Sequence, residues 1–109
     1  MQNNNFDEKI YSLLKKVPKG KITTYKILAE ALETKAYRAV GQAMRHNPFA
    51  PEVPCHRVVS SDGKIGGFSG TMDTESREIK KKIKMLKSEG INIKNNRIVD
   101  FEKVVFNEL

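Results

Sequence analysis

Residues 24–45 read TYKILAEALETKAYRAVGQAMR, and this stretch decides the expected fold. Apolar residues recur at helical spacing in two short segments, Tyr25 to Leu32 and Ala36 to Arg45. Only a short turn around residues 33–35 separates them. Two short helices joined by so tight a turn are typical of a helix-turn-helix, which the sequence therefore predicts at about residues 24–45.

The segments on either side are expected to complete a small, mainly helical domain. A helix precedes the motif and ends near Pro18, because proline and glycine there interrupt the apolar repeat. Residues 47–51 cannot form a regular helix, since two prolines lie among them. A short hairpin is predicted at residues 58–65, around the turn residues 61–63. A last long helix is expected from about Thr74 to Glu89, where Gly90 would stop it.

The predicted fold class is thus mainly α: a single winged helix-turn-helix-like domain with a short β-hairpin, spanning residues 1–109. A chain of 109 residues is enough for one core and too short for two. Hydrophobic residues make up 39% of it and charged residues 30%, as in a soluble globular domain. No apolar run is long enough to cross a membrane, and no amino-terminal signal pattern is present.

The charge of the chain is positive and uneven. The formal net charge is +7, and residues 15–47 contain eight basic residues against two acidic ones. A surface of one sign attracts a polyanion such as nucleic acid and steers its approach. Charge alone does not separate this interpretation from a solvated, lysine-rich surface.

Cysteine and histidine usage restricts the chemistry. The chain has one cysteine, so it forms no internal disulfide, and a reducing cytoplasmic location is expected. One cysteine and two histidines do not supply a structural zinc site. No phosphate-loop or dinucleotide-binding glycine pattern occurs. The prediction is a protein without metal or cofactor.

The single cysteine lies in the hexapeptide Pro54-Cys55-His56-Arg57-Val58-Val59. A thiolate is the nucleophilic form of cysteine, and a nearby imidazole or positive charge favours it. On an extended segment, adjacent Cys55 and His56 side chains would point to opposite faces, so a relay through water is easier to build than direct contact. The alternative is a buried structural cysteine.

Several stretches together resemble the O6-alkylguanine-DNA alkyltransferase family. The hexapeptide above and residues 37–48, YRAVGQAMRHNP, carry the resemblance, which extends to residues 17–20, 24–29, 67–70 and 89–90. It covers nearly all of that family's carboxy-terminal catalytic domain. The resemblance implies irreversible transfer of an alkyl group from guanine O6 in double-stranded DNA to the protein's own cysteine. The chain is expected to lack the amino-terminal domain that many relatives carry.

The resemblance also implies roles for individual residues in the reaction. Cys55 would be the alkyl acceptor, and His56 would draw off the thiol proton through water. Glu89 would orient His56. Asn47 would join the recognition helix to the active-site loop, residues 47–59, by hydrogen bonds.

Other residues would serve DNA binding and the base pocket. Tyr25 would meet the backbone phosphate, and Arg38 would fill the gap left by a flipped base, because guanine O6 is shielded inside a duplex. Small residues on the second helix would suit the minor groove. The implied DNA-binding set is Tyr25, Ala36, Arg38 and Gly41, and the implied base pocket is Met44, Val58, Phe68 and Ser69.

Two departures from the family pattern and two other functions remain open. Phe68 stands where many relatives have tyrosine, and the chain is longer between Gly70 and Glu89.

One alternative is a related DNA-binding module that senses lesions without repair, although such proteins usually lack the cysteine. The other is a helix-turn-helix regulator with Cys55 as redox sensor. Such a regulator would usually dimerise, whereas the sequence shows no strong dimer face and a monomer is expected.

Overall fold

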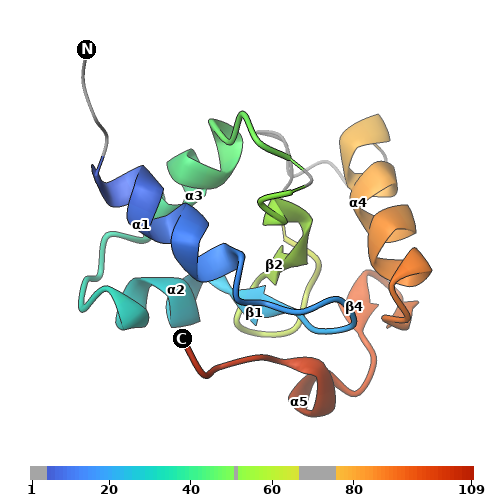
Figure 1. Ribbon diagram of the computed structural model, residues 1–109. Coiled ribbons are helices and arrows are strands. Elements are labelled where there is room, and N and C mark those ends of the chain that lie inside the picture. The colour runs from blue at the N-terminus through green and yellow to red at the C-terminus, as the bar shows by residue number, and fades with distance from the viewer. Residues whose placement is uncertain (1–4, 51, 67–75) are drawn as a thin grey trace.

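The computed structural model describes residues 5–50, 52–66 and 76–109, and Figure 1 shows the arrangement of its elements. In the described part of the chain, five α-helices, one 3₁₀ helix and four two-residue strands follow one another. Their order is α1 (Asn5–Leu14), β1 (Thr23–Thr24), α2 (Tyr25–Ala31), α3 (Tyr37–Arg45), η1 (Cys55–Arg57), β2 (Val58–Val59), α4 (Arg77–Ser88), β3 (Ile93–Lys94), β4 (Arg97–Ile98) and α5 (Phe101–Val104).

The helix ends follow from side-chain caps and glycine. Thr24 is extended and its side chain accepts a hydrogen bond from the Ile27 amide, so α2 begins at Tyr25. Ser76 caps α4 in the same way, which places the start of this helix at Arg77. The predicted start near Thr74 lies outside the described residues. Gly90, at φ +91°, follows Glu89 and ends α4 as predicted.

The strands pair differently from the sequence prediction. Val58 and Val59 pair in parallel with Thr23 and Thr24, not with residues 64–65. The turn within residues 58–65 is closed by hydrogen bonds from the Ser60 amide to the Lys64 carbonyl and from the Gly63 amide to the Ser60 carbonyl. The hairpin prediction at these residues was therefore wrong, because β2 finds its partner 35 positions upstream in β1 and leaves the turn as a loop.

A true hairpin forms near the carboxy terminus, from antiparallel strands β3 and β4. Asn95 and Asn96 at its turn both have left-handed backbones, at φ 52° and 60°. This is the type I′ geometry that two-residue hairpins favour, and asparagine tolerates it well.

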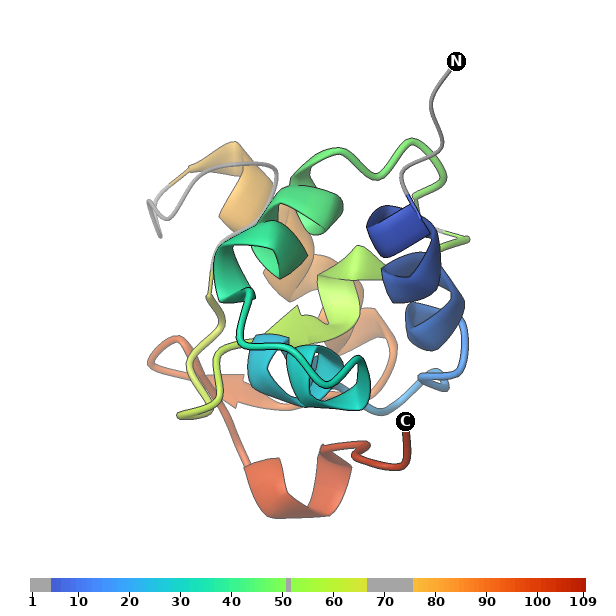
Figure 2. The same cartoon turned by 90° about the vertical axis from the view of Figure 1, so that its left-hand side faces the viewer.

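The core has two clusters on either side of the central segment η1–β2. One lies beneath α1, α2 and α3 and includes Leu14, Leu28, Val40 and Cys55. The other lies beneath α4 and includes Ile79 and Leu86. Figures 1 and 2 show α4 on the opposite side of η1 from α2 and α3. The segment that carries the cysteine thus runs through the centre of the molecule, with helices on both sides.

The mainly helical fold class predicted from the sequence is confirmed. The two helices expected at residues 25–32 and 36–45 correspond to α2 and α3, with a turn between them. Within the described ranges, no helix combines the length and the apolar character needed to span a bilayer.

Candidate functional site

Cys55 begins the one-turn helix η1, directly after the bend that follows α3. The amide of Arg57 donates to the Pro54 carbonyl at 2.9 Å, and the amide of Cys55 donates to the Val53 carbonyl at 2.8 Å. The segment is therefore 3₁₀-helical and not extended, which corrects the sequence prediction. Cys55 is 8% exposed and belongs to the core cluster beneath α1–α3. The thiol is nearly enclosed but still within reach of the surface.

His56 and Glu89 form the central polar contact of the site. His56 is 2% exposed, and its Nε2 lies 2.9 Å from Glu89 Oε2. A carboxylate can only accept hydrogen bonds, so a neutral His56 donates from Nε2 and carries its lone pair on Nδ1. An imidazole in this tautomer can act as a base through Nδ1.

Arg57 holds the Glu89 carboxylate in place. Its Nε donates to Glu89 Oε1 at 2.8 Å and its Nη2 donates to Oε2 at 2.9 Å, the two-pronged geometry that guanidinium favours. Its Nη1 donates to the Val17 carbonyl at 2.8 Å. Glu89 itself caps the end of α4. The network therefore ties the cysteine segment to the segment that follows α1 and to the end of α4.

The charges in this network follow from burial and hydrogen bonding. Burial lowers the pKa of His56 below its usual 6.5, and this effect outweighs the opposing influence of Glu89. Partial burial works against ionisation of Glu89, but the hydrogen bonds from Arg57 and His56 prevail and lower its pKa. At neutral pH the site therefore holds a neutral imidazole beside an ionised carboxylate.

Asn47 links the end of α3 to the segment before the cysteine. Its Nδ2 donates to the Val53 carbonyl at 2.8 Å, and its Oδ1 accepts from the Phe49 amide at 2.9 Å. These two bonds close the bend across the proline-rich residues, where a helix cannot continue. A displacement of α3 would therefore reach Cys55 through Asn47.

Tyr25 is the first residue of α2 and packs against the cluster that contains Cys55. Burial, and secondarily the charge of Cys55, raise the pKa of Tyr25 to about 12. Its hydroxyl consequently stays protonated and remains a hydrogen-bond donor over the physiological range. A Cβ atom on Gly66 would lie 3.5 Å from Tyr25 Cε2, so the ring lies beside the loop of residues 60–66.

Helix α3 presents one exposed and one buried face. Val40 and Ala43 are fully buried, whereas Tyr37, Arg38 and Arg45 are exposed. Gly41 is partly exposed, and a Cβ atom there would meet nothing within 4 Å. Nothing within the described protein therefore requires a glycine at this position, although glycine weakens a helix interior. Ala36, the residue that precedes α3, is exposed as well.

The predicted base pocket is described only in part. Met44 is half-buried and packs against the Cys55 cluster, and Val58 is fully buried. Phe68 and Ser69 lie outside the described residues. His46 and Tyr37 are both exposed.

Lys82 and Arg57 are two site residues that the sequence prediction missed. Lys82 of α4 is fully buried, and its Nζ donates to the carbonyls of Val58 and Ile65 at 2.6 and 2.7 Å. Burial lowers the pKa of Lys82 to about 7, and a charge on Cys55 would act in the opposite direction. A signal was available for Lys82, because it lies on the apolar stripe of α4 between Ile79 and Leu86.

Among the residues that the structure describes, no cluster of three or more histidine, cysteine or acidic side chains could hold a metal ion. The polar groups gathered here are instead a thiol, a neutral imidazole, an ionised carboxylate and a buried amine. Such a set suits proton transfer and attack by a thiolate.

The fold and the site define a class: a small helix-turn-helix domain that carries a nearly buried cysteine beside a histidine–glutamate–arginine network. Residues 5–91 match the family model described as the DNA-binding domain of 6-O-methylguanine DNA methyltransferase. The chain belongs to this family.

Relatives with related sequences are methyltransferases. A methylated-DNA–protein-cysteine methyltransferase from Sulfolobus acidocaldarius is 41% identical over 90 residues, covering 83% of this chain and 52% of the relative. A bifunctional methyltransferase/endonuclease from Picrophilus torridus is 40% identical over 98% of this chain and 34% of the relative. The chain thus spans between about a third and about half of the length of these relatives.

Some of the similar solved structures are complexes with DNA. The chain superposes on S. pombe Atl1, in complex with damaged DNA containing O6-carboxymethylguanine, with a TM-score of 0.78 and 26% identity over 97% of this chain and 98% of that one. It superposes on Mycobacterium tuberculosis OGT in complex with DNA with a TM-score of 0.71 and 33% identity over 82% of this chain and 51% of that one.

Proposed function

We propose that this chain is the catalytic domain of a DNA repair protein that transfers an alkyl group from guanine O6 to its own Cys55. The observation that carries the proposal is the contact of 2.9 Å between His56 Nε2 and Glu89 Oε2, directly beside the only cysteine. A thiol in this position needs a base to ionise, and the arrangement supplies one. The family and the methyltransferase relatives support the same reaction.

The proposed reaction balances within the site. His56 Nδ1 takes the thiol proton through a water molecule, and the sulfur lone pair forms a bond to the alkyl carbon. The bond between that carbon and O6 breaks, and guanine takes up one proton as it leaves. The Tyr25 hydroxyl, held protonated by burial, donates a hydrogen bond to the departing ring. The thioether on Cys55 is not converted back to a free thiol, so each protein molecule reacts once.

Helices α2 and α3 are proposed to place the lesion at this site. The exposed face of α3 would lie in the minor groove, where Gly41 and Ala36 allow close approach. Arg38, exposed near the start of α3, would occupy the base stack after the alkylated guanine is extruded. The positive charge of residues 15–47 would favour the DNA backbone. A cytoplasmic monomer without a cofactor is part of this proposal.

Intact-mass measurement tests the transfer. The protein is incubated with duplex DNA containing O6-methylguanine, and the expected result is a mass gain of one methyl group on Cys55. The Cys55→Ala variant is the matched control, because it retains the His56–Glu89 network and offers no other thiol. A wild-type protein of unchanged mass, or a Cys55→Ala variant that gains a methyl group, would contradict the proposal.

A second function, recognition of the lesion without repair, is favoured by the match to Atl1 over nearly the full length of both chains. The same experiment separates the two functions. A recognition protein would bind the O6-methylguanine duplex more tightly than the undamaged duplex and would keep its original mass. Retention of Cys55 in this chain favours transfer, since a recognition protein has no need of a nucleophile.

A further inference from the structure

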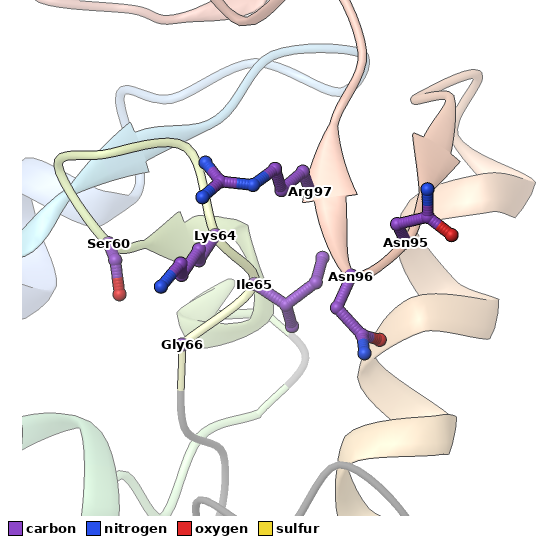
Figure 3. A pocket seen from close by; sticks show the side chains of 7 residues that line it. All are labelled: Ser60, Lys64, Ile65, Gly66, Asn95, Asn96 and Arg97. Atoms are coloured by element: carbon purple, nitrogen blue, oxygen red, sulfur yellow. The ribbon is translucent and has the colours of Figure 1, made fainter.

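A hollow of about 340 Å³ lies away from the cysteine, between the loop of residues 60–66 and the β3–β4 turn (Figure 3). Five of the seven residues that line it have polar or charged side chains, two of them are cations, and none is acidic. The lining residues are Ser60, Lys64, Ile65, Gly66, Asn95, Asn96 and Arg97.

Backbone hydrogen bonds fix the two walls of this hollow relative to each other. The Ile65 amide donates to the Asn96 carbonyl at 3.0 Å, and the Ile98 amide donates to the Gly63 carbonyl at 2.8 Å. The backbones of the loop and of the hairpin are therefore held together as one frame. The backbone positions from which their side chains extend are fixed relative to each other.

Lys64 and Arg97 stand opposite each other on this frame, as partners in an isolated antiparallel bridge. Like charges at directly opposite positions destabilise a strand pair. In the described part of the chain, the acid beside them is Asp62, whose Oδ2 lies 4.0 Å from Lys64 Nζ with both side chains more than half exposed. Arg97 Nη1 donates only weakly to the Asp62 carbonyl, at 3.2 Å. The protein therefore neutralises these two cations only in part, which leaves both of them able to bind an anion.

The chemistry of the lining favours a phosphate group. Lysine and arginine bind phosphate oxygens by charge-assisted hydrogen bonds, and serine hydroxyl and asparagine amide groups add neutral donors. In Figure 3 the Lys64 and Arg97 side chains extend to the same side of the frame, over the side that Ser60 and Gly66 border.

The hollow borders one residue of the proposed DNA surface, Tyr25. Gly66 lines it and also lies beside the ring of Tyr25, at the start of α2. In Figure 2 the loop of residues 60–66 and the β3–β4 turn project on the side of the molecule at which α3 begins. A duplex seated on α3 would therefore bring its backbone towards this hollow.

We propose that Lys64 and Arg97 bind a backbone phosphate of the duplex, so that the carboxy-terminal hairpin is part of the DNA footprint. The proposal rests on the proposed function, because it takes duplex DNA as the partner. It assigns to β4 a role in binding, in addition to its packing against the loop of residues 60–66.

The test compares two double variants that remove the same charge. The clamp variant, Lys64→Gln/Arg97→Gln, removes the two cations of the proposed phosphate site. The control variant, Lys84→Gln/Lys87→Gln, removes two exposed lysines of α4. Binding of undamaged duplex DNA is measured by fluorescence anisotropy over a range of salt concentrations. Each phosphate that the protein no longer neutralises should reduce the log–log salt slope by about 0.9. The clamp variant should therefore show a slope that is smaller by about 0.9, and the slope of the control should change much less.

Thermal melting of both variants accompanies the binding data. The clamp variant should melt at the wild-type temperature or above it, because a repulsive cross-strand pair has been removed. Equal slopes for the clamp variant and the wild type, or equal losses in both double variants, would overturn the proposal. The wild-type mass assay with the O6-methylguanine duplex runs in parallel. A smaller salt slope in the clamp variant alone supports the phosphate site, whatever the mass assay shows. Wild-type protein that acquires no methyl group would refute only the proposed transfer.

Discussion

Glu89 Oε2 lies 2.9 Å from His56 Nε2 although the two residues are 33 positions apart in the chain. The contact exists because the end of α4 returns to the centre of the molecule beside η1. Arg57 holds the carboxylate from the other side with two hydrogen bonds, so Glu89 cannot turn away from the imidazole. The consequence is a fixed tautomer of His56, with its basic Nδ1 left available for proton transfer.

Acidification should weaken both the reaction and the fold through His56. Burial lowers the pKa of folded His56, so the unfolded chain binds a proton more readily below the usual value of 6.5. The contribution of His56 to stability is therefore complete above about pH 6.5 and is lost as pH falls towards the lower folded pKa. The rate of alkyl transfer should decline as the folded imidazole becomes protonated.

The measurement is a pair of pH profiles, one of transfer rate and one of melting temperature, for the wild type and His56→Gln. Glutamine can still donate to Glu89 but does not titrate. The variant should transfer slowly at every pH, and its melting temperature should fall less between pH 6.5 and 5. Glu89 loses its own stabilising charge only at lower pH, because its pKa is depressed, so it leaves this window unaffected. Parallel melting curves for the two proteins would refute the assignment.

Lys82 should make the protein more stable as the solution becomes alkaline. Its pKa falls from 10.5 in the unfolded chain to about 7 in the fold, because the amine is buried. Between these two values the unfolded chain binds more protons, so the free energy of unfolding rises with pH, by up to about 1.4 kcal/mol per pH unit.

Chemical denaturation at pH 7 and pH 9, for the wild type and Lys82→Met, measures this effect. Methionine fills a similar volume without a titrating group, so the variant should lack the rise that Lys82 supplies. Other lysines and tyrosines titrate alike in both proteins and cancel in the comparison. A rise of the same size in both proteins would show that Lys82 keeps an ordinary pKa.

Gly41 offers a prediction in which stability and binding change in opposite directions. A Cβ atom at Gly41 meets nothing within 4 Å in the protein, so Gly41→Ala should stabilise α3 by about 0.5–1 kcal/mol. The same methyl group would face the proposed minor-groove contact and should weaken duplex binding. Melting temperature and anisotropy on the one variant test both effects. An unchanged affinity would mean that Gly41 does not face DNA.

The sequence predicted helices α2, α3 and α4 because their apolar spacing is regular and their ends carry capping residues or glycine. Contacts between distant segments were less accessible. Val58 and Val59 pair with β1, and no local pattern shows which strand a two-residue segment will choose. The sequence placed His56 beside Glu89 only through the family resemblance, since periodicity does not report a contact across 33 residues.

Lys82 shows a different limit of the sequence patterns. A lysine on an exposed helix face and a lysine on a buried stripe look the same by residue type, and lysine is almost always assigned to the surface. Its place on the apolar stripe between Ile79 and Leu86 is a signal for burial. The carbonyls of Val58 and Ile65 that accept from its amine belong to other elements, and they become visible only in the fold.

Alkylation of Cys55 should destabilise the domain. Cys55 is 8% exposed and lies in the same cluster as the fully buried Val40, Ala43 and Val58, so an alkyl group on its sulfur has little free space. Overpacking of such a site typically costs about 1–3 kcal/mol. For a domain near 100 residues, each kcal/mol lowers the melting temperature by about 4–8 °C. A benzyl group should lower it further than a methyl group. Melting the protein before and after stoichiometric reaction measures the effect, and the Cys55→Ala variant exposed to the same DNA serves as control. If the melting temperature is unchanged or higher after reaction, the space around the sulfur must be larger than the packing of this cluster indicates.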